Sequence, residues 1–385
     1  MRKRTGLTFR WCCLVVVLAT GLVAPAFAAE SPGLDALLGG SGREKLKAGL
    51  KTLVFDNGKT YSWQDYADWG KEIFLSGRVK KPPAGSGPSK PVSKYFTCAQ
   101  CHNHGREDPV LPVQDPEARF DWIERTGEKI FMLQGATLWG GVNRKAFYAG
   151  DYAKYHDLCV PQGEELFPWL PCGPIFGWCI PGCRTMDPES LVDATQVCSH
   201  YCSVGRYLKA WELSALLAFF WDREIKLEDL DLPPQTRADA LSIFNAPASD
   251  PQAAERQRNV LAGAYSNTAG NTFRGLPKLV GGSASGTPVV EYPDGSKFTG
   301  DSRRGADLWK LSCGHCHESP EHPLTREKAK DFSKDVEDFH AMIARGTRHS
   351  FRRYMPNFTL ERLSRRQSTD ILAFLQQFAA TGVRP

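Results

Sequence analysis

Long apolar runs, methionine and excess charge are all scarce in this sequence. Beyond residue 29 no stretch approaches the roughly 20 apolar residues that a membrane-spanning helix needs. Only five of the 385 residues are methionine, and the formal net charge is +5. Part of that charge comes from the first ten residues, at Arg2, Lys3, Arg4 and Arg10. The composition therefore argues against a membrane-embedded bundle and against a nucleic-acid partner.

The first 28 residues have the pattern of a secretory signal peptide. A basic stretch is followed by the apolar run 11–23 and then by Ala-Pro-Ala-Phe-Ala-Ala, which predicts cleavage after Ala28. A retained membrane anchor is the alternative, but the run is too short for one and Pro25 follows it. We therefore expect an exported, periplasmic protein in a compartment where disulfides persist.

Two short motifs contain four of the twelve cysteines. They are Cys98-Ala-Gln-Cys101-His102 and Cys313-Gly-His-Cys316-His317, and both have the C-x-x-C-H pattern of haem attachment. In such a turn two thiols reach the two vinyl groups on one edge of a porphyrin, and the histidine points at the iron. A zinc site would need further paired ligands nearby. We therefore predict two covalently bound haem c groups, with His102 and His317 as iron ligands.

The surroundings of the two motifs repeat as well. A Gly-x-x-x-aromatic pattern precedes each motif, at 70–74 and at 305–309. Matching apolar helical patterns follow the motifs, at 211–220 and at 370–375. An internal duplication is the simplest interpretation. Each half is predicted to contain a first helix, a haem turn, an irregular middle and a closing helix whose aromatic side chains cross the first.

On these residues both halves resemble class I c-type cytochrome domains, and the second half is the closer match. It also contains Ile343-Ala-Arg-Gly346 and Met355-Pro-Asn-Phe358. The resemblance implies that Met355 is the sixth ligand of the second iron. A thioether is a soft ligand that iron accepts, and the following proline stiffens the turn that presents it. His349 is the competing ligand.

The first half departs from this pattern, because no Met-Pro turn lies between its motif and its closing helix. Met132 lies in an apolar context that indicates core, whereas Met186 lies in a loop. Cys198 and Cys202, spaced i and i+4, share a helix face just before the closing helix. The sixth ligand of the first iron is left open between Cys198, Cys202, Met186, His200, His156, His104 and an open or water-bound position.

The stretch from Cys198 resembles, over a few residues, the haem-thiolate cytochromes of sulfur oxidation, such as the thiosulfate dehydrogenases. Cys198, Gly205 and the helix from Trp211 carry this resemblance, which implies a thiolate on the first iron. Six cysteines remain outside the motifs and the signal peptide, and three disulfides would use them all. A thiolate ligand would leave one cysteine unpaired. The six are Cys159, Cys172, Cys179, Cys183, Cys198 and Cys202.

The predicted fold class is mainly α, with two cytochrome-c-like helical domains joined by a long linker. The length agrees, because the chain exceeds what one compact core usually holds. We expect a first domain at 57–228, a linker with short helices at 229–295 and a second domain at 296–382. The first domain includes an insertion at 156–190, rich in Cys, Pro and Trp, that disulfides would staple.

These features predict a periplasmic dihaem cytochrome c that carries single electrons between redox partners, more an electron carrier than a catalyst. The alternative is an oxidoreductase that acts on a small compound, for example one of sulfur, at the first haem, with the second haem as electron exit. Several arginines of the second domain flank Met355. These arginines either form a solvated face that pairs with haem propionates or attract an acidic redox protein as partner.

Overall fold

The structure is a computed structural model of the chain. It describes residues 37, 42–52, 58–105, 116–127, 131–135, 137–144, 147–148, 157–161, 183–230, 232–245, 252, 255–256, 277–281, 287–318, 323–345, 355, 358, 360 and 362–384. These residues belong to one unit, 32–385. The predicted signal peptide lies outside them, as do Cys172 and Cys179 of the insertion.

Helices dominate, which confirms the predicted mainly α fold class. The α-helices before residue 250 are α2 (Gly42–Thr52), α3 (Trp63–Ser76), α4 (Pro116–Thr126), α5 (Leu191–Val197), α6 (Ala210–Trp221) and α7 (Pro234–Asn245). Shorter helical turns are η1 (Cys98–Gln100), η2 (Gly141–Asn143), the π-helical η4 (Cys198–Cys202) and η5 (Leu227–Asp229). The strands β1 (Cys159–Pro161) and β2 (Cys183–Thr185) pair antiparallel across the insertion.

The second half begins with a small antiparallel sheet in the order β3-β4-β5. Its strands are β3 (Lys278–Gly281), β4 (Val289–Glu291) and β5 (Lys297–Thr299). The turn between β4 and β5 lies where the Tyr-Pro-Asp-Gly-Ser sequence favours one. The helices that follow are α9 (Ser302–Ser312), α10 (Gly314–His317), α11 (Arg326–Ser333), α12 (Val336–Arg345) and α13 (Arg365–Thr381). None of the helices in the described part of the chain is long and apolar enough to cross a membrane.

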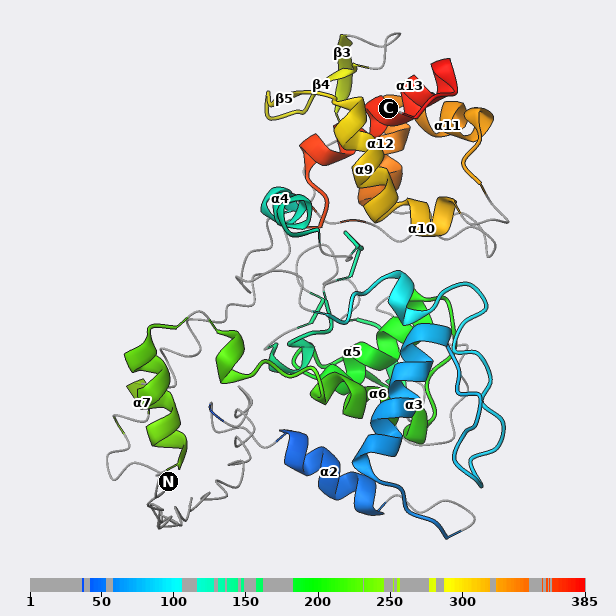
Figure 1. Ribbon diagram of the computed structural model, residues 1–385. Coiled ribbons are helices and arrows are strands. Elements are labelled where there is room, and N and C mark those ends of the chain that lie inside the picture. The colour runs from blue at the N-terminus through cyan, green and yellow to red at the C-terminus, as the bar shows by residue number, and fades with distance from the viewer. Residues whose placement is uncertain are drawn as a thin grey trace, which may run out of the picture. The chain divides into compact units, whose positions relative to one another are not determined.

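One helix crossing occurs in both halves, α3 with α6 and α9 with α13 (Figure 1). A glycine lies at each crossing. A Cβ on Gly70 would lie 2.0 Å from the carbonyl oxygen of Ala215, and a Cβ on Gly305 would lie 1.9 Å from that of Asp370. The two backbones therefore touch, and only glycine fits at these positions. The crossing of the first and closing helices agrees with the expectation from the sequence, whereas the close backbone contact at the glycine is a finding of the structure.

The aromatic residue of each pattern packs against the closing helix of the same half. The rings of Phe74 and Phe219 lie 5.4 Å apart between α3 and α6. The rings of Trp309 and Phe374 lie 6.0 Å apart between α9 and α13. The two halves thus share both the close approach of the helices and the ring contact beside it.

The apolar core of the second half contains residues from the first. α9, α12 and α13 supply half of its buried side chains, and Phe120 and Ile123 of α4 and the fully buried Met132 belong to the same cluster. Met132 is therefore a core residue, as its apolar context predicts. The segment 116–132 packs with the second half, although it precedes the closing helix of the first half in the sequence.

Candidate haem sites

Both C-x-x-C-H motifs form the same tight backbone turn. In the first, the N–H groups of Cys101 and His102 donate to the carbonyl oxygen of Cys98, at 3.1 and 2.9 Å. In the second, Cys316 and His317 donate to Cys313 at the same two distances. Such a turn brings the two thiols of a motif to one side and directs the histidine away from the chain. We call 98–102 the first attachment turn and 313–317 the second.

The attachment cysteines are free, shielded thiols. Burial raises the pKa of Cys98 to about 12 and that of Cys313 to about 12, so both are neutral at physiological pH. The two free thiols and the histidine of each turn are the groups that covalent haem attachment uses.

A cysteine lies close to the imidazole ring of the histidine in the first attachment turn. The Sγ atom of Cys198, in η4, is 4.0 Å from Nε2 of His102. On another side the ring of His102 rests against Gly135, where a Cβ would lie 2.2 Å from the imidazole Cε1. The ring is thus held between a backbone without a side chain and a buried sulfur.

Cys198 belongs to a cluster of polar side chains. A hydrogen bond with Cys202 lowers the pKa of Cys198 well below its ordinary value, and His102 acts in the same direction. The same bond raises the pKa of Cys202, which stays protonated. The hydroxyl of Tyr148 donates to Ala194 at 2.9 Å and lies 3.8 Å from the Cys202 sulfur. Both cysteines of the pair are free thiols and form no disulfide with each other.

Two backbone features mark this cluster as unusual. η4 is a π-helical turn, in which the N–H of Ser203 donates to the carbonyl oxygen of Cys198 at 2.9 Å. Such turns occur often at functional sites. Tyr148 has φ 57°, in the left-handed region that residues other than glycine rarely adopt.

Met186 is placed elsewhere in the first half. It is 3% exposed and packs in a small apolar cluster with Val160 and Val197. Met186 lies in a loop, but its side chain is buried and its thioether is part of this small core.

The histidine alternatives have other neighbours. The Nδ1 atom of His200 is 2.9 Å from the carbonyl oxygen of Gly205, and its ring stacks on Tyr207. His104 packs edge-on against Phe74, 5.5 Å between ring centres. His156 lies outside the described residues.

The second histidine lies between aromatic rings. The centre of the His317 ring is 5.6 Å from that of Trp309 and 5.2 Å from that of Phe332. Met355 is half-buried and packs against the same apolar core. The N–H of Phe358 donates to the carbonyl oxygen of Ile343 at 2.8 Å, which fastens the segment that follows Met355 to α12. His349, the competing ligand, lies outside the described residues.

Sequence reasoning missed three residues beside these turns. Gly135 leaves room for the His102 ring. Asn103 and Arg362 hold the backbone that runs between the two turns. A single glycine, asparagine or arginine has no distinctive spacing, so no pattern in the sequence points to them.

Comparison with known proteins covers one part of the chain. Residues 300–375 match the family described as cytochrome C oxidase, cbb3-type, subunit III. No curated protein and no solved structure matches the chain. The matched segment runs from α9 into α13 and contains the second attachment turn and Met355. This part of the chain is similar to a cytochrome c domain, and that similarity implies covalently bound haem c and electron transfer to redox partners.

Proposed function

We propose that the protein is an exported, periplasmic dihaem cytochrome c that carries single electrons between redox partners. The second half contributes the cytochrome c domain. The first half has the same attachment turn and the same glycine-centred helix crossing, which supports a second haem there. Each haem, when bound, supplies an iron that takes up and releases one electron.

The observation that carries this proposal is the position of Cys198 opposite His102. Imidazole nitrogen and thiolate sulfur are both ligands that a first-row metal accepts, and Nε2 of His102 and Sγ of Cys198 lie 4.0 Å apart. When the first haem is bound, His102 and Cys198 would therefore hold its iron, in preference to Cys202, Met186, His200, His156, His104 or an open position.

For the second iron we assign His317 and Met355. The rings of Trp309 and Phe332 restrict the orientation of the His317 imidazole. Ligation by Met and His raises the reduction potential of a c-type haem, whereas a thiolate donates charge to the iron. The second centre is therefore the electron acceptor of the pair. The arginines near Met355 in the sequence favour an acidic redox partner at this end.

A matched pair of cysteine variants tests the first centre. Electron paramagnetic resonance of the oxidised holoprotein should show one thiolate-ligated low-spin haem. Cys198→Ser should abolish that signal, whereas Cys202→Ser should retain it. Persistence of the thiolate signal in Cys198→Ser, or its absence from the wild type, would contradict the assignment.

A second candidate function is favoured by the cluster of Cys198, Cys202 and Tyr148. A half-buried cysteine with a lowered pKa, beside a second thiol and a tyrosine with a left-handed backbone, favours sulfur chemistry at this place. In this case the first haem would oxidise a small sulfur compound, and the second would export the electrons. Joining two thiosulfate ions through an S–S bond releases two electrons, one for each haem.

Thiosulfate and sulfite are suitable probes for this second function. Oxidised protein is mixed with each compound, and haem reduction is followed by optical absorption. Fast reduction that Cys198→Ser loses would support an oxidoreductase. If neither compound reduced the haems, and the haems bound neither cyanide nor carbon monoxide, the oxidoreductase would be excluded and the electron-carrier function would stand.

A further inference from the structure

One short segment is hydrogen-bonded both to the first attachment turn and to the second half of the chain, close to its attachment turn. We call Phe131–Gly135 the bridge segment. On its first side, the N–H of Gly135 donates to the carbonyl oxygen of Cys101 at 2.8 Å. The Asn103 side chain pairs with the backbone of Phe131, donating to its oxygen at 2.5 Å and accepting from its nitrogen at 3.2 Å. The bridge segment is thus fixed at both of its ends to the first turn and the residue that follows it.

The middle of the bridge segment is bonded to the second half. The N–H of Met132 donates to the carbonyl oxygen of Leu311 at 3.0 Å, and Leu311 precedes Cys313 by two residues in the chain. The buried Arg362 donates from Nε to the carbonyl oxygen of Leu133 at 3.0 Å. Neighbouring residues of the bridge segment are therefore bonded to the first attachment turn and to a residue of α9 that lies just before the second.

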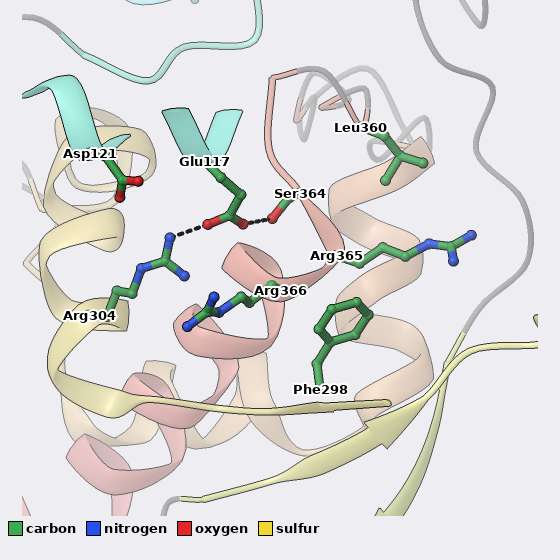
Figure 2. Close-up of a pocket in the computed structure, with 8 residues that line it drawn as sticks. All are labelled: Glu117, Asp121, Phe298, Arg304, Leu360, Ser364, Arg365 and Arg366. Carbon is green, nitrogen blue, oxygen red and sulfur yellow. Dashed lines mark hydrogen bonds and ion pairs between the residues drawn. The ribbon is translucent and has the colours of Figure 1, made fainter. Parts of the chain in front are cut away.

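Buried contacts around α4 hold this arrangement in place. Glu117 of α4 pairs with Arg304 of α9 and accepts a hydrogen bond from Ser364, in a pocket where these elements meet (Figure 2). Arg304 also binds the buried Asp370 at 2.7 Å. The amide of Gln367, which is fully buried, donates to the carbonyl oxygen of Pro116 at 2.7 Å. An ion pair and hydrogen bonds of this kind resist sliding, because breaking them leaves buried groups without partners.

We propose that the bridge segment holds the two haem groups at one fixed separation and forms the path along which an electron passes between them, with Asn103 and Arg362 as positioning residues. The step moves one electron from the ferrous first iron to the ferric second iron and needs no proton. Electron tunnelling weakens steeply with distance and is better through covalent and hydrogen bonds than across gaps. The proposal rests on the dihaem function proposed above.

The separation of the irons can be measured directly. Pulsed electron paramagnetic resonance of the fully oxidised holoprotein should give a single narrow distribution of iron–iron distances. A broad distribution in the wild type would overturn the proposal without any variant, because a fixed bridge permits only one separation. This readout is independent of redox activity.

Asn103→Ala tests the first side of the bridge segment. After one haem is reduced by a light flash, redistribution of the electron between the haems should be independent of protein concentration in the wild type. Asn103→Ala should slow this step several-fold and broaden the distance distribution. Asn143→Ala is the matched control, because Asn143 also binds a backbone group, the N–H of Ile225 at 2.9 Å, but not in the bridge segment. Asn103→Gln should restore part of the rate.

Arg362→Gln tests the contact of the bridge segment with the second half of the chain. It replaces Asn103→Ala as the test if that variant fails to load haem. Its control is Arg326→Gln, since Arg326 also donates to backbone carbonyl oxygens, those of Ala379 and Ala380. If electron redistribution between the haems were as fast as in the wild type in both Arg362→Gln and a haem-loaded Asn103→Ala, the proposed role of the bridge segment would be overturned, but the dihaem function would not. A purified protein with fewer than two haems would instead overturn the dihaem function.

Discussion

At the scale of single residues, the two attachment turns differ in the sulfur atoms near them. The Sγ atom of Cys198 lies 4.0 Å from Nε2 of His102, whereas Met355 is half-buried against the core of the second half. The helix crossings are alike in the two halves, so the difference resides in the segments between the helices. In the proposed dihaem protein, a thiolate and a thioether would stabilise different oxidation states of iron and so set the direction of electron flow.

Met355→Ala should lower the reduction potential of the second haem, by an amount on the order of 0.1 V, because the axial ligand is a main determinant of haem potential. The haem should stay attached, since its thioether bonds are unchanged. Potentiometric titration followed by optical absorption measures the effect. Met342→Ala is the control and should leave the potential unaltered. Equal potentials in Met355→Ala and the wild type would exclude Met355 as a ligand.

Some site residues could be predicted from the sequence, and others could not. The attachment cysteines and histidines follow from spacing, because thioether chemistry demands adjacent residues in one turn. Cys198 was one of several candidates, since the fold of the preceding loop decides which side chain reaches His102. Asn103 acts by pairing with the Phe131 backbone, and a contact of this kind has no sequence signature.

At the scale of helices, the paired crossings define each half. Gly70→Ala and Gly305→Ala should each destabilise the fold by about 1–3 kcal/mol or more, because the added methyl group meets backbone atoms that cannot move aside. Chemical denaturation of the holoprotein measures the loss. Gly49→Ala in α2 is the control: a Cβ there has no neighbour within 4 Å, so a gain of about 0.5–1 kcal/mol is expected. Wild-type stability in both crossing variants would contradict the close helix contact.

The helices were easier to predict than their partners. α3, α6, α9 and α13 follow from apolar periodicity and from capping sequences such as Ser62 with Asp65. The sequence does not predict that α4 packs against the second half, because the apolar face of this helix fits any core of similar shape. Only tertiary contacts, such as that of Glu117 with Arg304, distinguish one core from the other.

At the scale of the whole molecule, acid should weaken the fold through His340. This residue is 3% exposed, with Nδ1 3.1 Å from the hydroxyl of Tyr292 and 3.2 Å from that of Ser368. Burial lowers its pKa from 6.5 to about 3. At pH values between these two pKa values, His340 binds a proton in the unfolded chain but not in the folded chain. The free energy of unfolding should therefore fall with decreasing pH, by about 1.4 kcal/mol per pH unit from this group.

His340→Gln should reduce this pH dependence, measured as the unfolding midpoint in denaturant between pH 6.5 and 4. Asp370 provides a control of opposite sign. Burial raises its pKa from 3.8 to about 6 despite the nearby Arg304, so the folded chain binds its proton more tightly and this group favours folding in acid. Asp370→Asn should therefore steepen the loss of stability on acidification. Parallel pH profiles for His340→Gln and the wild type would contradict the assigned role.

The measurement that tests the central claim most directly is the intact mass of protein purified from a host that matures c-type cytochromes. Two haem attachments predict a mass increase of two haem groups over the processed polypeptide. Replacement of Cys98 and Cys101 by alanine should reduce the increase to one, and the same change at Cys313 and Cys316 should do likewise. A wild-type increase of one haem or none would contradict the account.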